Sequence, residues 1–173
     1  LEGSSYAYAF SSGLAAESSL LLSLLHQGDH IIAFYDIYGG TQRLFNDILT
    51  QYGFEITYVD ATEPENVEQA IRENTRLVWI ESPSNPFLRL CDIQAIADIA
   101  HKKDVLLVVD NTFLSPYFQR PLELGADVVS YSATKYLGGH SDVLAGALTT
   151  NNKQIADRIY LQQNATGTVL SPF

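Results

Sequence analysis

Short apolar runs alternate with longer segments of helical periodicity along almost the whole chain, and this alternation limits the fold more than any other feature. The run at 105–110, VLLVVD, is almost continuously apolar, which is typical of a strand buried on both faces. Other strand-like runs occupy 30–35, 54–60, 76–81, 126–131 and 142–150, and helix-like segments occupy 13–28, 41–53, 62–74, 92–104 and 152–165. Strands alternating with helices predict an α/β fold with a mostly parallel central sheet flanked by helices.

Capping residues mark several of the predicted helix ends. Gly28 and Gly53 each follow a helical segment, where glycine commonly ends a helix. Thr62 and Glu65 have the spacing of a capping box, and Asp92 stands where the N-cap of a helix is expected. These residues predict where four of the helices begin or end.

Composition excludes several classes of protein. The formal net charge is −10, from 20 acidic and 10 basic side chains, whereas binding a nucleic-acid backbone needs clustered Lys and Arg. Cys91 is the only cysteine, so neither an internal disulfide nor a cysteine-based metal cluster is expected, and a reducing, cytoplasmic location is compatible. The apolar stretch at 19–34 is too often broken by polar residues to span a bilayer.

The length of the chain suits one domain. Its 173 residues are 46% hydrophobic, which is enough for a sizeable core. The sequence opens on Leu1 and closes on LSPF, so we expect a domain that is cut at both ends.

Polar, loop-forming residues follow four of the predicted strands. The motifs are DIYGGT after 30–35, ESPSNP after 76–80, DNTF after 105–109 and SATK after 126–131. Ligands of open α/β sheets bind beyond the carboxyl ends of the strands. These four loops are therefore the predicted place of the functional site.

Asp110 and Lys135 carry the charges that most need explanation in these loops. Asp110 ends an apolar run, where it is either a turn residue bonded to local backbone or a carboxylate held for a cationic ligand atom. Lys135, the only lysine between Lys103 and Lys153, is either a surface lysine or a buried amine nucleophile.

Small and hydroxyl residues in the same regions suit an anion. Gly13 stands at a predicted helix start, where free N–H groups favour an anion, although an ordinary serine cap explains it equally. Ser132 and Thr134 precede Lys135 and suit a phosphate, although both residue types are common in turns. Tyr38 is either core or a stacking platform for a flat ligand, and Asn85 is either a turn residue or a ligand donor.

Together these residues supply an amine, a carboxylate, phosphate-binding groups and an aromatic ring. That set fits pyridoxal 5′-phosphate, whose aldehyde forms a Schiff base with a lysine and whose ring nitrogen pairs with an acidic residue. A general nucleotide-binding domain is disfavoured, because neither a GxGxxG nor a Walker-type loop is present.

Longer motifs add a resemblance. The stretches FSSGLAA, GDHIIAFYDIYGGTQRLF, IESPSNPFLRLCDI, VVDNTFLSPYFQRPLELGADVVSYSATKYLGGHSDVLAG and LQQNATGTVLSPF resemble, in order, the pyridoxal-phosphate enzymes of cysteine and methionine metabolism. The resemblance implies that residues 1–173 are the cofactor-binding large domain of a fold type I enzyme, truncated at both ends, without the family's N-terminal arm and C-terminal substrate domain.

The resemblance also implies a role for each candidate residue. Lys135 would carry the Schiff base and move the α-proton, and Asp110 would keep the ring nitrogen protonated. Tyr38 would stack on the ring and assist proton transfer. The remaining contacts would be Asn85 to the ring hydroxyl, the N–H groups of Gly13 and Leu14 to the phosphate, and the hydroxyls of Ser132 and Thr134 to the phosphate.

Two positions depart from the family pattern. Leu14 replaces a methionine that is usual there, a change that a backbone contact tolerates, and Glu17 stands where an apolar residue is more usual. The implied parent is a homo-oligomer, a dimer of dimers, that acts on small amino acids.

The implied reaction is γ-elimination or γ-replacement of the cystathionine γ-synthase or γ-lyase type. A homoserine-ester sulfhydrylase is the next alternative. Methionine γ-lyase is disfavoured because Gly40 stands where those enzymes usually have cysteine. A non-catalytic, isolated cofactor domain is the alternative of another class.

Overall fold

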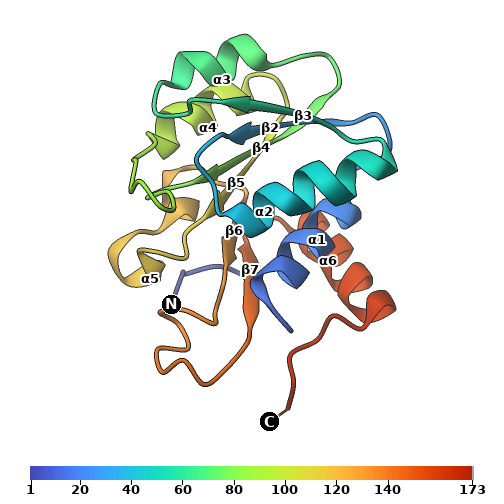
Figure 1. Ribbon diagram of the computed structural model, residues 1–173, viewed down its shortest axis with the longest axis vertical. Helices are drawn as coiled ribbons and strands as arrows, with labels where there is room; N and C mark the ends of the chain where they lie inside the picture. Colours follow the sequence, from blue (N-terminus) through green and yellow to red (C-terminus); the bar gives the residue numbers. More distant parts are fainter. Residues whose placement is uncertain (173) are drawn as a thin grey trace.

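One twisted seven-stranded sheet runs through the middle of the protein, as the computed structural model, which describes residues 1–172, shows (Figure 1). The strands lie in the order β1-β7-β6-β5-β4-β2-β3. Neighbours from β3 to β6 are parallel, and β7 is antiparallel to both β6 and β1. The strands are β1 (Tyr6–Phe10), β2 (His30–Phe34), β3 (Glu55–Val59), β4 (Thr75–Glu81), β5 (Leu106–Asp110), β6 (Val128–Tyr131) and β7 (Gly146–Thr150).

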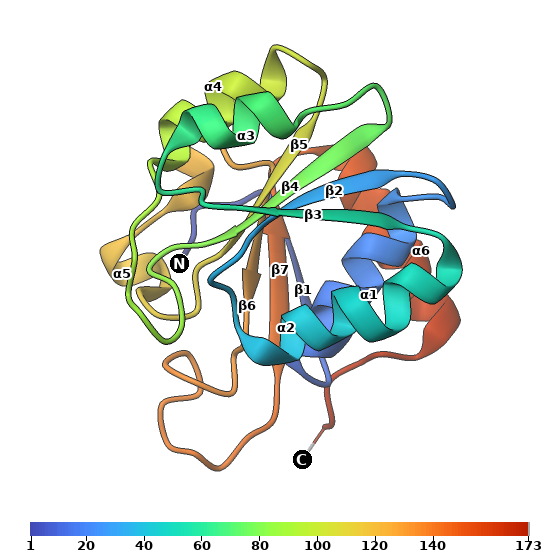
Figure 2. The ribbon, with the colours of Figure 1, turned by 45° about the horizontal axis from the view of Figure 1, so that its top comes forward.

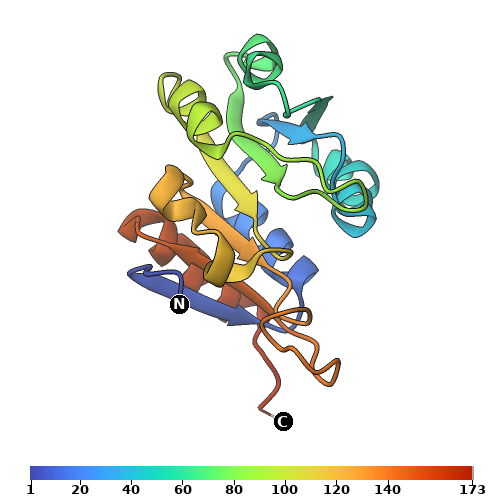
Figure 3. The same ribbon diagram turned by 90° about the vertical axis from the view of Figure 1, so that its left-hand side faces the viewer.

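Helices cover both faces of the sheet. Helices α1, α2 and α6 lie on one face, and α3 and α4 lie on the other (Figures 2 and 3). The α-helices are α1 (Gly13–Leu24), α2 (Gly39–Arg43), α3 (Pro64–Ala70), α4 (Ile93–His101), α5 (Ser115–Phe118) and α6 (Lys153–Thr166). The predicted α/β class with a mostly parallel, helix-flanked sheet is therefore confirmed.

Apolar side chains of the inner strands form the core. Every residue of β2 is buried, and Val108, Trp79 and Ile80 are fully buried. Strands that are covered by helices on both faces have apolar side chains pointing in both directions. No helix among residues 1–172 is long and apolar enough to cross a membrane.

Most predicted boundaries hold to within a few residues. Asp92 caps α4 as predicted, since its Oδ1 accepts a hydrogen bond from the Ala95 N–H at 3.0 Å. The predicted helix at 41–53 is one helical stretch from α2 through a π-helix (Leu44–Ile48) and a 3-10 helix (Leu49–Tyr52). It ends at Gly53, whose positive φ of 80° suits glycine.

The predicted capping box of α3 is wrong. The helix begins at Pro64, and the hydroxyl of Thr62 donates instead to Oδ1 of Asp60 at 2.6 Å. The nearby carboxylate competes for the hydroxyl, and proline at N1 has no N–H that needs a cap. The helix ends at Ala70, four residues before the predicted end at 74.

Three elements were not predicted. Strand β1 lies at an edge of the sheet and pairs with β7, whose residues are about 140 positions away in the sequence. Helix α5 and the 3-10 helix Pro121–Leu124 are each a single short turn. Their stability depends on contacts that local periodicity does not reveal.

Candidate functional site

The carboxyl ends of the central strands bring three polar residues into line. Strand register places Glu81 of β4 opposite Asp110 of β5, and Asp110 opposite Ser130 of β6. Residues in register on neighbouring strands point to the same face of a sheet. The predicted site edge therefore contains two carboxyl groups side by side.

Asp110 is buried, with 6% of its surface exposed. Its Oδ1 accepts a hydrogen bond from the N–H of Thr112 at 2.9 Å. Burial raises the pKa of Asp110 above its ordinary value, and the hydrogen bonds from Thr112 oppose that rise. Asp110 is thus a turn residue bonded to local backbone, which was one of its two interpretations. It is also kept out of water, as a carboxylate held for a cationic ligand atom would be.

Glu81 is a site residue that the sequence interpretation missed. Its Oε2 accepts a hydrogen bond from the N–H of Tyr38 at 2.7 Å, and the N–H of Asn85 also stabilises its charged form. Burial first, and then the charges of Asp110 and Asp36, raise the pKa of Glu81. The signal was available, because Glu81 ends an apolar strand just as Asp110 does.

The loop after β4 is held to the loop after β2. The hydroxyl of Ser84 hydrogen-bonds to the Asp36 carboxylate, and the N–H of Ser84 donates to the Arg89 carbonyl at 3.0 Å. The guanidinium of Arg89 lies 5.4 Å from the centre of the Tyr35 ring. These contacts bring Asn85 and Tyr38 to the same side of the strand ends.

The first turn of α1 lies against the residue that follows β6. A Cβ built on Gly13 would lie 3.1 Å from Cβ and 3.2 Å from Cα of Ser132. Ser12 is the N-cap, and its Oγ accepts from the Ala15 N–H at 3.0 Å, so the serine cap predicted as one interpretation exists. The N–H groups of Gly13 and Leu14 still have no acceptor within the helix, because they belong to its first turn.

Ser132 is joined to Asp110 through one residue. The N–H of Ser132 donates to Oγ1 of Thr112 at 2.8 Å, and the N–H of Thr112 donates to Asp110. A continuous set of contacts therefore runs from Gly13 through Ser132 and Thr112 to Asp110.

Thr134 fixes the base of the loop between β6 and β7. Its hydroxyl donates to the carbonyl oxygen of Ala145 at 3.1 Å and accepts from the N–H of the same residue at 2.9 Å. Both contacts keep Thr134 beside the start of β7. Its predicted contact with a phosphate stays a prediction.

Lys135 is exposed, so the hypothesis of a buried lysine is wrong for this structure. Its N–H donates to the Ser132 carbonyl at 3.1 Å, and its own carbonyl accepts from the Gly139 N–H at 2.7 Å. The loop that carries Lys135 extends beyond the strand ends at the bottom of Figure 1, where no other described element covers it. Lys135 is nevertheless three residues from Ser132, which lies within the site.

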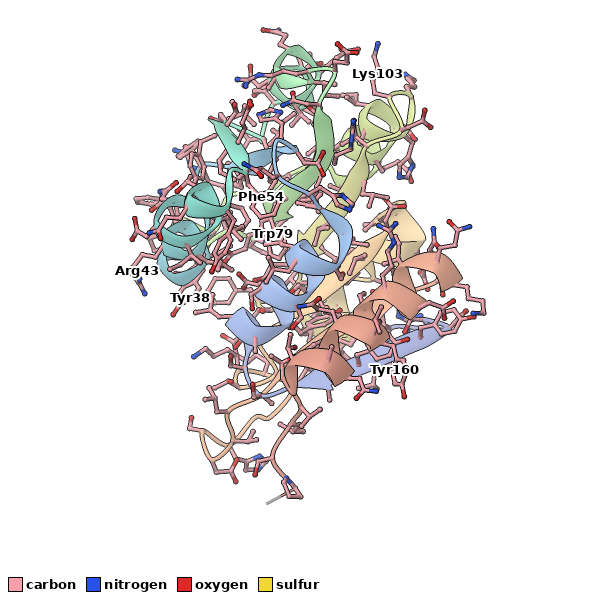
Figure 4. The ribbon with its side chains drawn as sticks, turned by 90° about the vertical axis from the view of Figure 1, so that its right-hand side faces the viewer. Tyr38, Arg43, Phe54, Trp79, Lys103 and Tyr160 are labelled. Carbon is pink, nitrogen blue, oxygen red and sulfur yellow. The ribbon has the colours of Figure 1, made fainter. Side chains whose placement is uncertain are left out.

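Tyr38 caps the start of α2, and 44% of its surface is exposed. Figure 4 shows Tyr38 at the lower edge of α2 in that view. A Cβ built on Gly40 would lie 2.2 Å from Cε1 of the Tyr38 ring. Glycine at this position therefore leaves room for the ring.

The chain matches the sequence model of the Cys/Met metabolism PLP-dependent enzymes over residues 1–173. It belongs to this family. Cystathionine beta-lyase MetC from Staphylococcus haemolyticus is 53% identical over 171 residues, which are 99% of this chain and 44% of that protein. Cystathionine gamma-lyase from Bacillus subtilis is 51% identical over 172 residues, which are 99% of this chain and 45% of that protein.

Solved structures of the same family have the same fold. MetB from Corynebacterium glutamicum superposes with a TM-score of 0.97 at 46% identity, covering 98% of this chain and 44% of that one. Cystathionine gamma-lyase from Lactobacillus plantarum, complexed with L-serine, superposes with a TM-score of 0.96 at 46% identity. The match covers 99% of this chain and 45% of that one. The chain therefore spans less than half the length of these relatives.

The site of this Cys/Met metabolism family member suits the cofactor in its family's name. The N-terminus of α1 supplies free N–H groups next to Ser132, where an anion is favoured. Asp110 supplies a buried carboxyl group that suits a cationic nitrogen, and Tyr38 supplies an aromatic ring. The donor set at these three places matches the phosphate, the ring nitrogen and the ring face of pyridoxal phosphate.

Proposed function

We propose that the whole protein catalyses γ-elimination or γ-replacement on sulfur amino acids or activated homoserine, as a cystathionine γ-lyase or γ-synthase. This chain supplies most of the cofactor-binding domain. The observation that supports it best is the continuous set of contacts from Gly13 through Ser132 and Thr112 to Asp110. These contacts join the N-terminus of α1, which suits an anion such as a phosphate, to a buried carboxyl group, which suits a cationic ring nitrogen.

Each candidate residue has a role in the proposed reaction. Pyridoxal phosphate, when bound, supplies an aldehyde that combines with an amine and a ring that accepts an electron pair. The Lys135 amine would bind the aldehyde and, when released from it, would take up the α-proton. The N–H groups of Gly13 and Leu14 and the hydroxyls of Ser132 and Thr134 would hold the phosphate.

The residues near Asp110 orient the ring. Asp110 would hold a proton on the ring nitrogen, because a buried carboxylate is stabilised by a cation beside it. Tyr38 would stack on the ring, and Asn85 would donate to the ring hydroxyl. The hydrogen bond from the Tyr38 N–H to Glu81 fixes the backbone that carries the stacking ring.

Gly40 supports a cystathionine γ-lyase or γ-synthase over a methionine γ-lyase. Any side chain at this position would occupy the space of the Tyr38 ring, since its Cβ would lie 2.2 Å from Cε1. A homoserine-ester sulfhydrylase stays the next alternative, because the residues described here act before the reactions diverge.

We also propose that the whole protein is a homo-oligomer located in the cytoplasm. Large apolar side chains are exposed after β4 and in α5, a pattern that suits a protein interface. Phe87 is 70% exposed, Leu88 63%, Tyr117 84% and Phe118 75%. Sedimentation of the whole protein tests the oligomer, and a monomer at micromolar concentration would contradict it; cell fractionation tests the location.

Cofactor binding is tested by titrating the chain with pyridoxal phosphate and recording its absorbance. We expect a yellow band that Lys135→Ala abolishes. Lys103→Ala is the matched control, because Lys103 is an exposed lysine in the turn after α4, far from the 132–145 loop (Figure 4). Equal bands in the chain, the Lys135→Ala variant and the control would overturn the role of Lys135.

Turnover is tested on the whole protein. Cystathionine is offered alone, and an activated homoserine is offered with cysteine, so that lyase and synthase are separated. Since one relative is named a cystathionine β-lyase, the thiol released from cystathionine is identified: cysteine indicates cleavage at the γ-carbon and homocysteine cleavage at the β-carbon. Asp110→Ala should retain the fold and lose most activity, and unchanged turnover would refute the role of Asp110.

A further inference from the structure

Two buried polar side chains join the ends of β5 and β6 on the face of the sheet opposite to Asp110. Asp110 is in register with Ser130, so the next residue along each strand, Asn111 and Tyr131, points to the other face. Nδ2 of Asn111 donates to the Tyr131 hydroxyl at 2.9 Å. Asn111 is fully buried and Tyr131 is 2% exposed. The proposed reaction uses neither side chain, so their burial needs another explanation.

Gln119 extends these contacts to β4. It follows α5, and its Nε2 donates to the carbonyl oxygen of Ser82 at 2.7 Å and to Oδ1 of Asn111 at 2.9 Å. Its own backbone carbonyl accepts from Nδ2 of Asn111 at 2.8 Å. One amide side chain therefore links the ends of two neighbouring parallel strands, β4 and β5.

Two backbone carbonyls fix the direction of these bonds. A carbonyl oxygen can only accept, so Nε2 of Gln119 faces Ser82 and Nδ2 of Asn111 faces Gln119. The second N–H of Asn111 then donates to the Tyr131 hydroxyl. Because the phenol accepts from Asn111, its one proton is left for Oε2 of Glu2, which accepts it.

Glu2 completes the set from a segment that is distant in the sequence. It lies before β1, 129 positions from Tyr131, and 5% of its surface is exposed. Burial raises the pKa of Glu2, and the hydrogen bond from Tyr131 opposes that rise. Without the Tyr131 hydroxyl, a buried carboxyl oxygen and a buried amide N–H would each lose a partner, which is costly.

Each strand end in this set of contacts is next to a residue of the candidate site. The pairs are Ser82 with Glu81, Asn111 with Asp110, and Tyr131 with Ser132. Successive Cα atoms are held about 3.8 Å apart, so a residue that shifts on one face of the sheet moves its neighbour on the other. The contacts on the reverse face therefore act on the spacing of the site residues.

We propose that these four side chains form a positioning brace for the candidate site. The brace consists of Glu2, Asn111, Gln119 and Tyr131. It fixes the ends of β4, β5 and β6, and thereby the distance between Asp110 and Ser132. The ring nitrogen and the phosphate of pyridoxal phosphate are joined by a rigid ring and a short arm, so they fit only a narrow range of spacings. This inference rests on the proposed function, because it assigns those two groups to Asp110 and Ser132.

Hydrogen exchange of the whole protein without cofactor, followed by mass spectrometry, tests whether the brace holds the strand ends. The N–H of Asn111 donates to the Ser130 carbonyl at 3.0 Å. The N–H of Ser132 donates to Oγ1 of Thr112 at 2.8 Å. Tyr131→Phe removes only the hydroxyl oxygen, and we expect exchange about tenfold faster in the peptides that contain these two groups. Equal exchange there in the variant and in the unmodified protein would overturn the brace.

Tyr58→Phe is the matched control. The Tyr58 hydroxyl donates to Oδ1 of Asn46 at 2.9 Å, so the same kind of bond is lost, but in β3 at an edge of the sheet. Exchange around β5 and β6 should then equal that of the unmodified protein. Glu2→Leu removes the acceptor of the phenol and should act as Tyr131→Phe does, whereas Glu2→Gln keeps an accepting carbonyl oxygen and should leave exchange unchanged. Equal exchange in the two Glu2 variants would contradict the bond from Tyr131 as the cause.

The positioning role is tested by titrating the whole protein with pyridoxal phosphate. Tyr131→Phe and Glu2→Leu should bind about tenfold more weakly, as expected for the loss of one hydrogen bond. The circular dichroism of the yellow band should change as well, because it depends on how the ring is oriented. Glu2→Gln and Tyr58→Phe should match the unmodified protein in both measurements.

The two sets of measurements separate the possible outcomes. If Tyr131→Phe exchanges faster but binds and orients the cofactor as the unmodified protein does, the brace only stabilises the fold and the positioning role is refuted. If the unmodified protein binds no pyridoxal phosphate, the proposed function fails and the positioning role fails with it. Hydrogen exchange then still decides whether the brace holds the strand ends.

Discussion

Replacing Gly146 by alanine tests how closely α1 must approach the sheet. Gly146 is the first residue of β7, and it is buried against the backbone that precedes α1. An alanine Cβ there would lie 2.1 Å from the carbonyl oxygen of Ser12 and 2.9 Å from the nitrogen of Gly13. Both atoms belong to the backbone, so no side-chain rotation relieves the overlap.

The size of the effect follows from these distances. A close carbon–oxygen contact measures about 3.3 Å, so β7 and the start of α1 must separate by roughly 1 Å. Overpacking of this kind costs about 3 kcal/mol in the free energy of unfolding. The same shift moves the N–H groups of Gly13 and Leu14 away from Ser132, and losing one charged hydrogen bond weakens phosphate binding by about tenfold to a hundredfold.

The two effects are measured separately. Urea unfolding followed by circular dichroism gives the stability, and an absorbance titration with pyridoxal phosphate gives the dissociation constant. Gly39→Ala is the matched control, since its Cβ would meet only a nitrogen of Arg43, at 3.7 Å, and alanine favours the helix. If Gly146→Ala matches Gly39→Ala in both stability and affinity, the close approach does not matter and the reasoning is wrong.

Three further substitutions test single contacts. Gly40→Ala should displace the Tyr38 ring and weaken pyridoxal-phosphate binding by up to about tenfold, the range of one aromatic contact; equal titration curves would contradict this. Burial lowers the pKa of His30, so the unfolded chain takes up a proton that the fold excludes, and stability should fall as the pH drops below about 6.5. In urea titrations at pH 7 and pH 5, His30→Gln should lose less free energy of unfolding between the two pH values than the unmodified chain does. An equal loss in both would refute the role of His30. Asp92→Ala should lower the free energy of unfolding by about 1 kcal/mol, because α4 loses its N-cap. A urea midpoint equal to that of the unmodified chain would show that the cap contributes nothing.

The fold class was predictable because its signals are local. Buried strands such as β5 are continuous apolar runs, and helices such as α4 have a capping residue and a periodic apolar face. Strand β1 was missed because its five residues are held by pairing with β7, which local sequence does not encode. The capping box of α3 failed because Asp60 competes for the Thr62 hydroxyl.

The candidate site was only partly predictable. Asp110, Gly13 and Ser132 were chosen from their places beside strands and helices, and the structure joins them through Thr112. Glu81 was missed although it ends a strand as Asp110 does. For Lys135 the sequence left a surface lysine and a buried amine open, and the structure shows it exposed, on a loop that no described element covers.

The sequence by itself determined the order of strands and helices, and thereby which loops meet at the carboxyl edge of the sheet. Periodicity and capping act between residues a few positions apart, so they can be read along the chain. Only the tertiary structure decided the charge states at that edge, where Glu17 from a helix and Glu81 and Asp110 from two strands share one buried region. Desolvation and repulsion depend on distance through space, and those distances are set only when the sheet and its helices pack together.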